Sequence, residues 1–278
     1  PKSGPAPVIN LGKPQTFTLK NGMKVLVVEN NKLPRAYANL SIDNKPDYEG
    51  KIKGVSSLVS SLMGNGTENQ SKDDFNEEID FLGARLNIGI GGGSANSLTK
   101  YSNRMLELLA DATMNPLLTE EEFQKEKEKL IEGIKSDAKS VDAIAGRAGG
   151  ALAYGKHHPY GEFVTEESVE AVTLADVKAY FEKYFTPNNT YLVIIGDVNT
   201  KSVVKLAKKH FKNWEKAATM TTEIVEPNTN PEALESNFID MPNAVQSNIS
   251  LTSNVKVKMS DPDYHAVLIA NKILGGGF

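Results

Sequence analysis

The stretch Gly54-Val55-Ser56-Ser57-Leu58-Val59-Ser60-Ser61-Leu62-Met63-Gly64-Asn65-Gly66-Thr67 decides how this chain is interpreted. Its apolar residues recur at i, i+3, i+4 and i+7, which predicts one buried stripe of an α-helix that ends at Gly64. The opposite face carries four serines. Serine is a poor helix former, so four small hydroxyl groups favour a face that lies against a wall or a narrow cavity. The alternative is an ordinary small-residue packing face.

The residues of this helix resemble the pitrilysin and insulinase family of inverted zinc metallopeptidases, which includes the processing peptidases. In that family the helix reads Gly-x-x-His-x-x-Glu-His-x-x-x-x-Gly-Thr, where the histidines bind zinc and the glutamate polarises the attacking water. When the pattern is placed on Gly54 and Gly66-Thr67, the histidines fall on Ser57 and Ser61 and the glutamate falls on Ser60. The resemblance therefore implies a site that has lost all three groups of this helix.

The third zinc ligand of the family is a glutamate on a later helix, which resembles residues 122–134 of this chain. The resemblance places that ligand on Gly133, and a register shift of one residue would place it on Glu132. Serine hydroxyls are poor zinc ligands, and one carboxylate beside three serines could not hold the ion. We therefore expect no metal site and no cofactor in this chain, with zinc only in an active partner.

Other catalytic arrangements have weaker support. The chain has no cysteine and four histidines, none of which stand at i, i+4: His157, His158, His210 and His265. The adjacent pair precedes Pro159-Tyr160-Gly161, a loop signature that the family shares and uses structurally. A serine nucleophile is disfavoured because no histidine or lysine base lies nearby in sequence and no nucleophile-elbow motif is present.

Composition is typical of a globular protein. The 278 residues are 40% hydrophobic and 24% charged, enough for one large core or two smaller ones. The net charge of -4, with interleaved basic and acidic residues, argues against a nucleic-acid partner, and no apolar run has membrane-spanning length. The chain begins at Pro1 without a methionine, so we expect that a preceding segment, such as a signal peptide, was removed or is not included in this sequence. The compartment stays open, and the sequence favours an exported protein in the periplasm of a bacterium.

The predicted elements form an α+β fold in which helices pack on a mostly antiparallel sheet. Residues 15–19 and 23–29 predict a β-hairpin with a type I′ turn at Asn21-Gly22, and residues 191–198 predict a buried strand. The resemblance implies the metallopeptidase fold of the processing-peptidase and LuxS type.

A long-period repeat predicts that this domain is duplicated. Asn39-Leu40-Ser41-Ile42 recurs as Asn248-Ile249-Ser250-Leu251, and Pro46-Asp47-Tyr48 recurs as Pro262-Asp263-Tyr264, each ahead of an apolar helix. We therefore expect a complete N-terminal peptidase-like domain at 1–214, a linker at 215–235, and the start of a second homologous domain at 236–278.

The leading functional hypothesis is a non-catalytic peptidase-like subunit that pairs as a heterodimer with a zinc-bearing family member and forms half of a peptide-binding chamber. The peptide would add a strand to an exposed sheet edge, for which the candidates are Ile88, Gly89, Ile90 and Gly91, because glycines permit close backbone approach. A plain solvent-exposed hairpin explains this segment equally well. Two further hypotheses are a zinc metalloendopeptidase with a site not yet recognised, and a stand-alone peptide-binding or assembly protein.

Overall fold

The computed structural model describes residues 13–217 and 225–276. The described residues group into two compact units. The first unit combines residues 13–137 with 164–217, and the second combines 138–163 with 225–276. The expected domain at 1–214 differs from this grouping at residues 138–163, and its boundaries stay a prediction.

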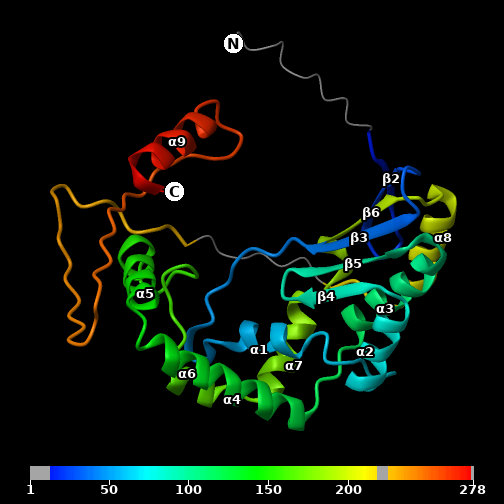
Figure 1. The fold of residues 1–278 in the computed structure, drawn as a ribbon, viewed down its shortest axis with the longest axis horizontal. Helices are drawn as coiled ribbons and strands as arrows, with labels where there is room; N and C mark the ends of the chain where they lie inside the picture. The colour runs from blue at the N-terminus through cyan, green and yellow to red at the C-terminus, as the bar shows by residue number, and fades with distance from the viewer. Residues whose placement is uncertain (1–12, 218–224, 277–278) are drawn as a thin grey trace. The chain divides into compact units, whose positions relative to one another are not determined.

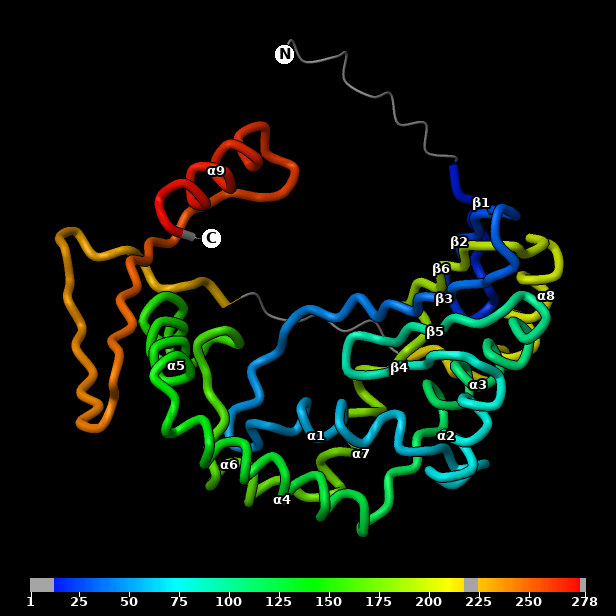
Figure 2. The backbone as a smooth tube through the Cα atoms, in the orientation of Figure 1, coloured from blue at the N-terminus to red at the C-terminus, as the bar shows by residue number. Residues whose placement is uncertain are grey.

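The first unit is built on a six-stranded sheet with the order β1-β2-β6-β3-β5-β4. Four of its five strand pairs are antiparallel, and only β2 and β6 run parallel. Figure 2 traces the chain into β6, which lies between β2 and β3 although it comes last in sequence. The strands are β1 (Gln15–Thr18), β2 (Lys24–Glu29), β3 (Arg35–Ile42), β4 (Arg85–Gly89), β5 (Gly92–Leu98) and β6 (Thr190–Gly196).

Helices cover one face of this sheet, as Figure 1 shows, which confirms the α+β fold class. Alternate residues of the strands point into a core with these helices; in β3 all four inward residues are buried. The helices of the first unit are α1 (Val55–Leu62), α2 (Lys72–Phe81), α3 (Ser102–Met114), α4 (Glu120–Asp137), α6 (Glu166–Ala171), α7 (Leu174–Tyr184) and α8 (Thr200–His210).

The hairpin of β1 and β2 forms as expected, but its turn is not of type I′. A type I′ turn needs positive φ at both central residues, and only Gly22 has it, at 94°. The N–H of Gly22 donates to the carbonyl of Leu19 at 3.0 Å, which closes a turn over residues 19–22. Gly22, the last residue of this turn, has the positive φ. Asn21 instead donates its side-chain amide to the carbonyl oxygens of Phe211 and Trp214, which fixes the hairpin to the end of α8.

The second unit contains α5 (Val141–Tyr154) and α9 (Tyr264–Asn271), followed by a π-helical turn at Lys272–Gly276. Asn254 connects its two sequence segments, because its side-chain amide donates to the carbonyl of Ala153 at 2.6 Å. Residues 248–251 repeat the sequence of a β3 segment but form no strand. β3 is held between β5 and β6, whereas no described strand flanks residues 248–251. The homologous second domain therefore stays a prediction.

Among the described helices, none is both long and apolar enough to cross a membrane.

Candidate functional site

Helix α1 has the two faces that its sequence predicts. The four apolar residues Val55, Leu58, Val59 and Leu62 are fully buried. On the other face Ser57 and Ser61 are exposed, and Ser56 and Ser60 are half-buried. The helix therefore folds on its apolar stripe alone, and its serines border the surface.

The start of α1 is fixed by backbone geometry and by one carboxylate. Gly54 has a φ of 102°, which favours glycine, and the carboxylate of Glu49 accepts hydrogen bonds from the N–H groups of Gly54 at 2.6 Å and Ser56 at 3.2 Å. A negative charge at a helix N-terminus is favourable because it meets unpaired N–H groups. In the preceding loop, the hydroxyl of Tyr184 donates to Asp47, which also pairs with Lys183 at 3.0 Å. These contacts hold the serine face in a defined place.

Ser60 brings the serine helix against the glycine-rich turn between β4 and β5. Its Oγ accepts a hydrogen bond from the N–H of Ile90 at 3.4 Å, and a Cβ added at Gly89 would lie 2.6 Å from the same oxygen. An open hollow of about 470 Å³ lies here, lined by Ser60, by residues 39–41 and by residues 87–94. The structure therefore places Ser60, where the resemblance puts the family's glutamate, beside all four residues of the candidate peptide-binding segment.

That segment also lies at an edge of the sheet. Strand β4 is the last in the sheet order, with only β5 beside it among the described strands. Such an edge presents unpaired backbone N–H and C=O groups to which another strand can bind. Part of the glycine content has a purely structural cause, because the backbone of Gly92 approaches the carbonyl of Leu40 too closely for any side chain.

Gly133 and Glu132, the two candidates for the family's third ligand position, lie on α4 and do not line this hollow. Gly133 and Glu132 are both exposed, and a Cβ added at Gly133 would meet no atom within 4 Å. Helices α1 and α4 pack together, since a Cβ at Gly54 would lie 3.6 Å from Leu130. Glycine at 133 is thus not required by packing.

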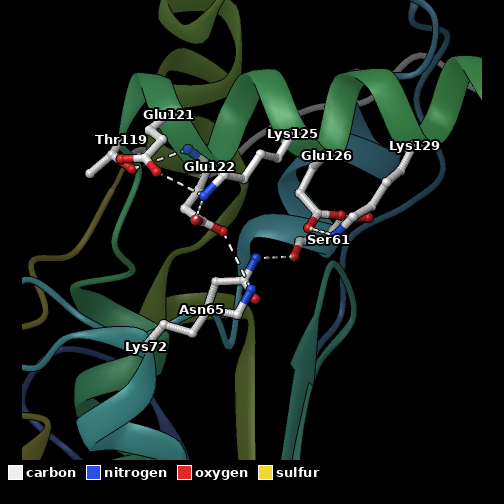
Figure 3. Close-up of polar contacts among 9 residues, drawn as sticks. All are labelled: Ser61, Asn65, Lys72, Thr119, Glu121, Glu122, Lys125, Glu126 and Lys129. Atoms are coloured by element: carbon white, nitrogen blue, oxygen red, sulfur yellow. Dashed lines mark hydrogen bonds and ion pairs between the residues drawn. The ribbon is translucent and has the colours of Figure 1, made fainter.

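Two carboxylates of α4 near the serine helix were not singled out from sequence. The side chains of Glu122 and Glu126 are only 16% and 12% exposed, and in Figure 3 they project from α4 on the side of Ser61. Their spacing of four residues is the signal that could have identified them, because it places both on one face of the helix.

Lysines neutralise both of these carboxylates. Glu122 pairs with Lys72 at 3.3 Å and with Lys125 at 3.0 Å, and Glu126 pairs with Lys129 at 2.7 Å. The hydrogen bond from Lys125 is the main cause that holds the pKa of Glu122 below its ordinary value.

This set of side chains does not fit a zinc ion. The positions at which the resemblance expects the ligands and the base carry three neutral hydroxyls and a glycine, and the nearby carboxylates are engaged by lysines. Across the part of the chain that the structure describes, no three His, Cys, Asp or Glu residues are grouped as metal ligands. In the second unit, His158 has a structural role in a turn, where its Nδ1 accepts the N–H of Tyr160 at 3.0 Å and its ring stacks on Tyr154.

Comparison with known proteins identifies the family. The model of the insulinase family (peptidase family M16) matches residues 24–148, and the model named peptidase M16 inactive domain matches residues 171–278. The chain belongs to the M16 peptidase family. Its relatives include an uncharacterized zinc protease YmxG of Bacillus subtilis, 27% identical over 78% of this chain and 54% of that protein.

Two further M16 relatives have comparable identity. A probable mitochondrial-processing peptidase subunit beta of Schizosaccharomyces pombe is 23% identical over 95% of this chain and 59% of that protein. The zinc protease PqqE of Helicobacter pylori is 27% identical over 78% of this chain and 51% of that protein. The chain thus spans between half and three-fifths of the length of these relatives.

Solved M16 structures share the fold. The M16 inactive domain of Pseudomonas fluorescens superposes with a TM-score of 0.75 and 22% identity, over 96% of this chain and 65% of that one. A protease from Helicobacter pylori superposes with a TM-score of 0.67 and 21% identity, over 80% of this chain and 55% of that one. At these identities the likeness establishes the fold alone.

Proposed function

We propose that this M16 chain is a non-catalytic subunit that forms half of a peptide-binding chamber with a zinc-bearing family member. The observation that carries the proposal is the serine face of α1. Ser57, Ser60 and Ser61 stand where the family has its histidines and general base, while the helix keeps its apolar stripe and its place in the fold. Three small hydroxyls on an intact helix fit a chain that forms the wall of the chamber while a partner carries out the chemistry.

Peptide binding is proposed at the edge strand β4. An extended peptide beside β4 would run past the hollow at Ser60 and the turn of residues 88–91. On one side it would meet the exposed hydroxyls of Ser57 and Ser61, which are small and uncharged. This arrangement favours recognition through the peptide backbone, with little selection of one side chain.

Pairing with an active partner draws support from the relatives. Among them are proteins named subunits: mitochondrial-processing peptidase subunit beta of several organisms, and cytochrome b-c1 complex subunit 1 of Bos taurus, which is 25% identical over 71% of this chain. A non-catalytic chain in such a family gains a function when a second chain supplies the zinc.

The decisive experiment measures cleavage of a quenched-fluorescent peptide library by this chain, by an M16 member from the same organism with an intact zinc motif, and by their mixture. We expect no cleavage by this chain alone and more cleavage by the mixture than by the zinc-bearing member alone. Chelator-sensitive cleavage by this chain alone would refute the proposal, and so would a mixture that is no more active than the zinc-bearing member.

Two matched glycine variants test whether a peptide binds beside strand β4. Gly89→Val brings a branched side chain against the Oγ of Ser60, whereas Gly133→Val projects into open space on an exposed helix face. We expect Gly89→Val to weaken binding of an extended peptide, measured by fluorescence anisotropy, and Gly133→Val to leave it unchanged. Equal binding by both variants would exclude this part of the edge as the peptide site.

A further inference from the structure

The chain contains two Asn-Gly pairs, Asn21-Gly22 and Asn65-Gly66. An asparagine before glycine loses its side-chain amide more readily than other asparagines, because glycine has no side chain to shield its backbone nitrogen and adopts many backbone conformations. The reaction requires this nitrogen to reach the Cγ of the asparagine. Hydrogen bonds that hold the amide or the N–H group oppose that movement, so the surroundings of the two pairs determine which one reacts.

Hydrogen bonds hold both reacting groups of the first pair. The side-chain amide of Asn21 donates to the carbonyls of Phe211 at 2.9 Å and Trp214 at 3.1 Å. The N–H of Gly22 donates to the carbonyl of Leu19 at 3.0 Å. All three hydrogen bonds must break before the nitrogen can attack and the amide can leave. The fold therefore protects the first pair.

The second pair is held by a single hydrogen bond. The side-chain amide of Asn65 donates to the carbonyl of Ser61 at 3.0 Å, at the end of α1 (Figure 3). Within residues 13–217 and 225–276, no hydrogen bond to the Oδ1 of Asn65 or from the N–H of Gly66 is present. Asn65 is partly exposed in the short connection between α1 and α2. The nitrogen that attacks is thus not engaged, and the amide that leaves is held at one atom only.

Glycine at position 66 is required by the fold. Its φ is 97°, and a Cβ there would lie 2.8 Å from the backbone nitrogen of Lys72 and 2.9 Å from the carbonyl oxygen of Gln70. An alanine would therefore meet both strain and a clash with backbone atoms. Asn65 is not constrained in this way, because its side chain makes only the bond to Ser61. The fold thus requires the glycine that makes its neighbour reactive.

We propose that Asn65 is a site of spontaneous deamidation and that Asn21 is not. The backbone nitrogen of Gly66 gives its proton to water and forms a bond to the Cγ of Asn65. The Cγ–Nδ2 bond then breaks, the leaving nitrogen takes up a proton, and ammonia departs from a cyclic imide. One water molecule adds to either carbonyl of this ring and opens it, which gives aspartate or isoaspartate at position 65. The reaction is independent of peptide binding and of the proposed partner.

Deamidation changes the end of α1. The new carboxylate has no proton to donate to the carbonyl of Ser61, and it places a negative charge beside the last carbonyls of the helix, where the helix dipole disfavours anions. Isoaspartate also lengthens the main chain by one methylene just before Thr67, whose N–H donates to the carbonyl of Gln70 at 2.9 Å. The product therefore has a less stable last turn of α1, next to Ser61.

The test incubates the full 278-residue chain in mildly alkaline buffer, which favours deprotonation of the backbone nitrogen, until a guanidinium-unfolded sample has reacted at both pairs. Peptide mapping by mass spectrometry measures the mass increase from amide to carboxyl at each pair. In the folded chain we expect conversion at Asn65 to be at least about tenfold faster than at Asn21, and this ratio should shrink in the unfolded sample. Equal rates in the folded chain, faster conversion at Asn21, or no conversion at Asn65 would overturn the proposal.

Three variants test the modification and its effect on α1. Asn65→Gln should abolish conversion at position 65, because glutamine must close a larger ring. Asn65→Asp reproduces the charge of the product and should lower the melting temperature. The matched control is Asn213→Asp, at an exposed asparagine whose side chain makes no hydrogen bond to another described residue, and it should leave the melting temperature unchanged. Equal melting temperatures for Asn65→Asp and the unmodified chain would refute the effect on α1.

Discussion

At Gly92 the backbone has a φ of +113°, and a Cβ there would lie 2.0 Å from the carbonyl oxygen of Leu40. The neighbouring Gly91 is exposed, and a Cβ there would meet no atom within 4 Å. We expect Gly92→Ala to lower the free energy of unfolding by about 2 kcal/mol or more, because strain and the clash add. Gly91→Ala should change it by less than about 0.5 kcal/mol. Urea unfolding measures the free energy of unfolding of both variants. Equal losses of that free energy would contradict the steric role of Gly92 in the turn.

Gly92 shows that a glycine-rich sequence does not reveal which group its backbone approaches. The sequence predicts a peptide-binding edge at residues 88–91 because glycine permits close backbone approach. The structure has three such approaches, of Gly92 to β3, of Gly93 to the carbonyl of Asn87 and of Gly89 to Ser60, and all three lie within the chain itself. Sequence spacing cannot distinguish approach to a ligand from approach to a neighbouring strand, because the partner strand comes from a distant part of the chain. The role of residues 88–91 in peptide binding therefore stays a prediction.

At the scale of the element, helix α1 packs in the core through one face and carries the serines on the other. Leu58 is 0% exposed, whereas Ser57 is exposed on the opposite face. We expect Leu58→Ala to lower the free energy of unfolding by about 2 to 5 kcal/mol, because it leaves a cavity under the sheet. Ser57→Ala should be nearly neutral, within about 0.5 kcal/mol. Large losses for both variants in thermal or urea unfolding would show that the two faces have been assigned wrongly.

Helices α2 and α3 are joined by an ion pair whose strength depends on pH. Arg104 donates to both carboxylate oxygens of Glu78, at 2.6 and 2.8 Å, and this is the main cause that holds the pKa of Glu78 below its ordinary value. A carboxyl with a depressed folded-state pKa stabilises the fold above its unfolded pKa of about 4.3, and that stability is lost as pH falls through the folded pKa.

The expected result is a pH-dependent difference between variants. Glu78→Gln should lower the melting temperature at pH 7, and the difference from the unmodified chain should shrink as the pH falls below about 4. Glu77→Gln, at an exposed neighbouring position, is the matched control and should show no such convergence. A Glu78→Gln penalty that stays constant across the pH range would contradict the ionic origin of this stabilisation.

The elements that were predicted well are those with a local signal. The i, i+3, i+4, i+7 stripe predicts α1, which ends at Leu62, two residues before Gly64, and the apolar run at 191–198 predicts β6, which lies inside the sheet. The cap of α8 has no such local signal, because Asn199 accepts the N–H of Ser202 while the neighbouring Thr200 bonds Glu29 of β2. That choice depends on a strand 171 residues away, so no local pattern could reveal it.

At the scale of the whole molecule, sequence and structure divide the chain differently. The repeat and the polar stretch at 215–235 predict a boundary near that linker, whereas residues 138–163 group with the C-terminal segment. Hydrogen bonds join the two segments, since the side-chain amides of Asn254 and Asn228 donate to the carbonyls of Ala153 and Leu152. Many apolar residues of the second unit are exposed, including Leu234, Phe238 and Leu274. A unit with so little buried apolar surface has only a small driving force for folding by itself.

The proposed loss of the zinc site leads to a prediction in which metal binding and peptide cleavage are measured separately. We expect the purified chain to bind no stoichiometric zinc, because serines occupy three of the four family positions and a glycine the fourth. The variant with Ser57→His, Ser60→Glu, Ser61→His and Gly133→Glu supplies the family's ligands on a helix that is already folded, and positions 57, 61 and 133 are exposed enough to accept larger side chains. Zinc binding should return, as measured by elemental analysis at neutral pH.

Peptide cleavage should not return with the zinc. Positioning of the substrate accounts for about 7 to 11 kcal/mol of a reaction barrier, and in the proposed chamber much of that positioning comes from the opposing half. The control is the same variant with serine kept at position 61, which lacks one ligand and should bind zinc far more weakly. If the fourfold variant folds by circular dichroism but binds no more zinc than this control, the placement of the motif on Ser57, Ser60, Ser61 and Gly133 is wrong. Cleavage by the fourfold variant alone would instead show that this chain orients a peptide without a partner.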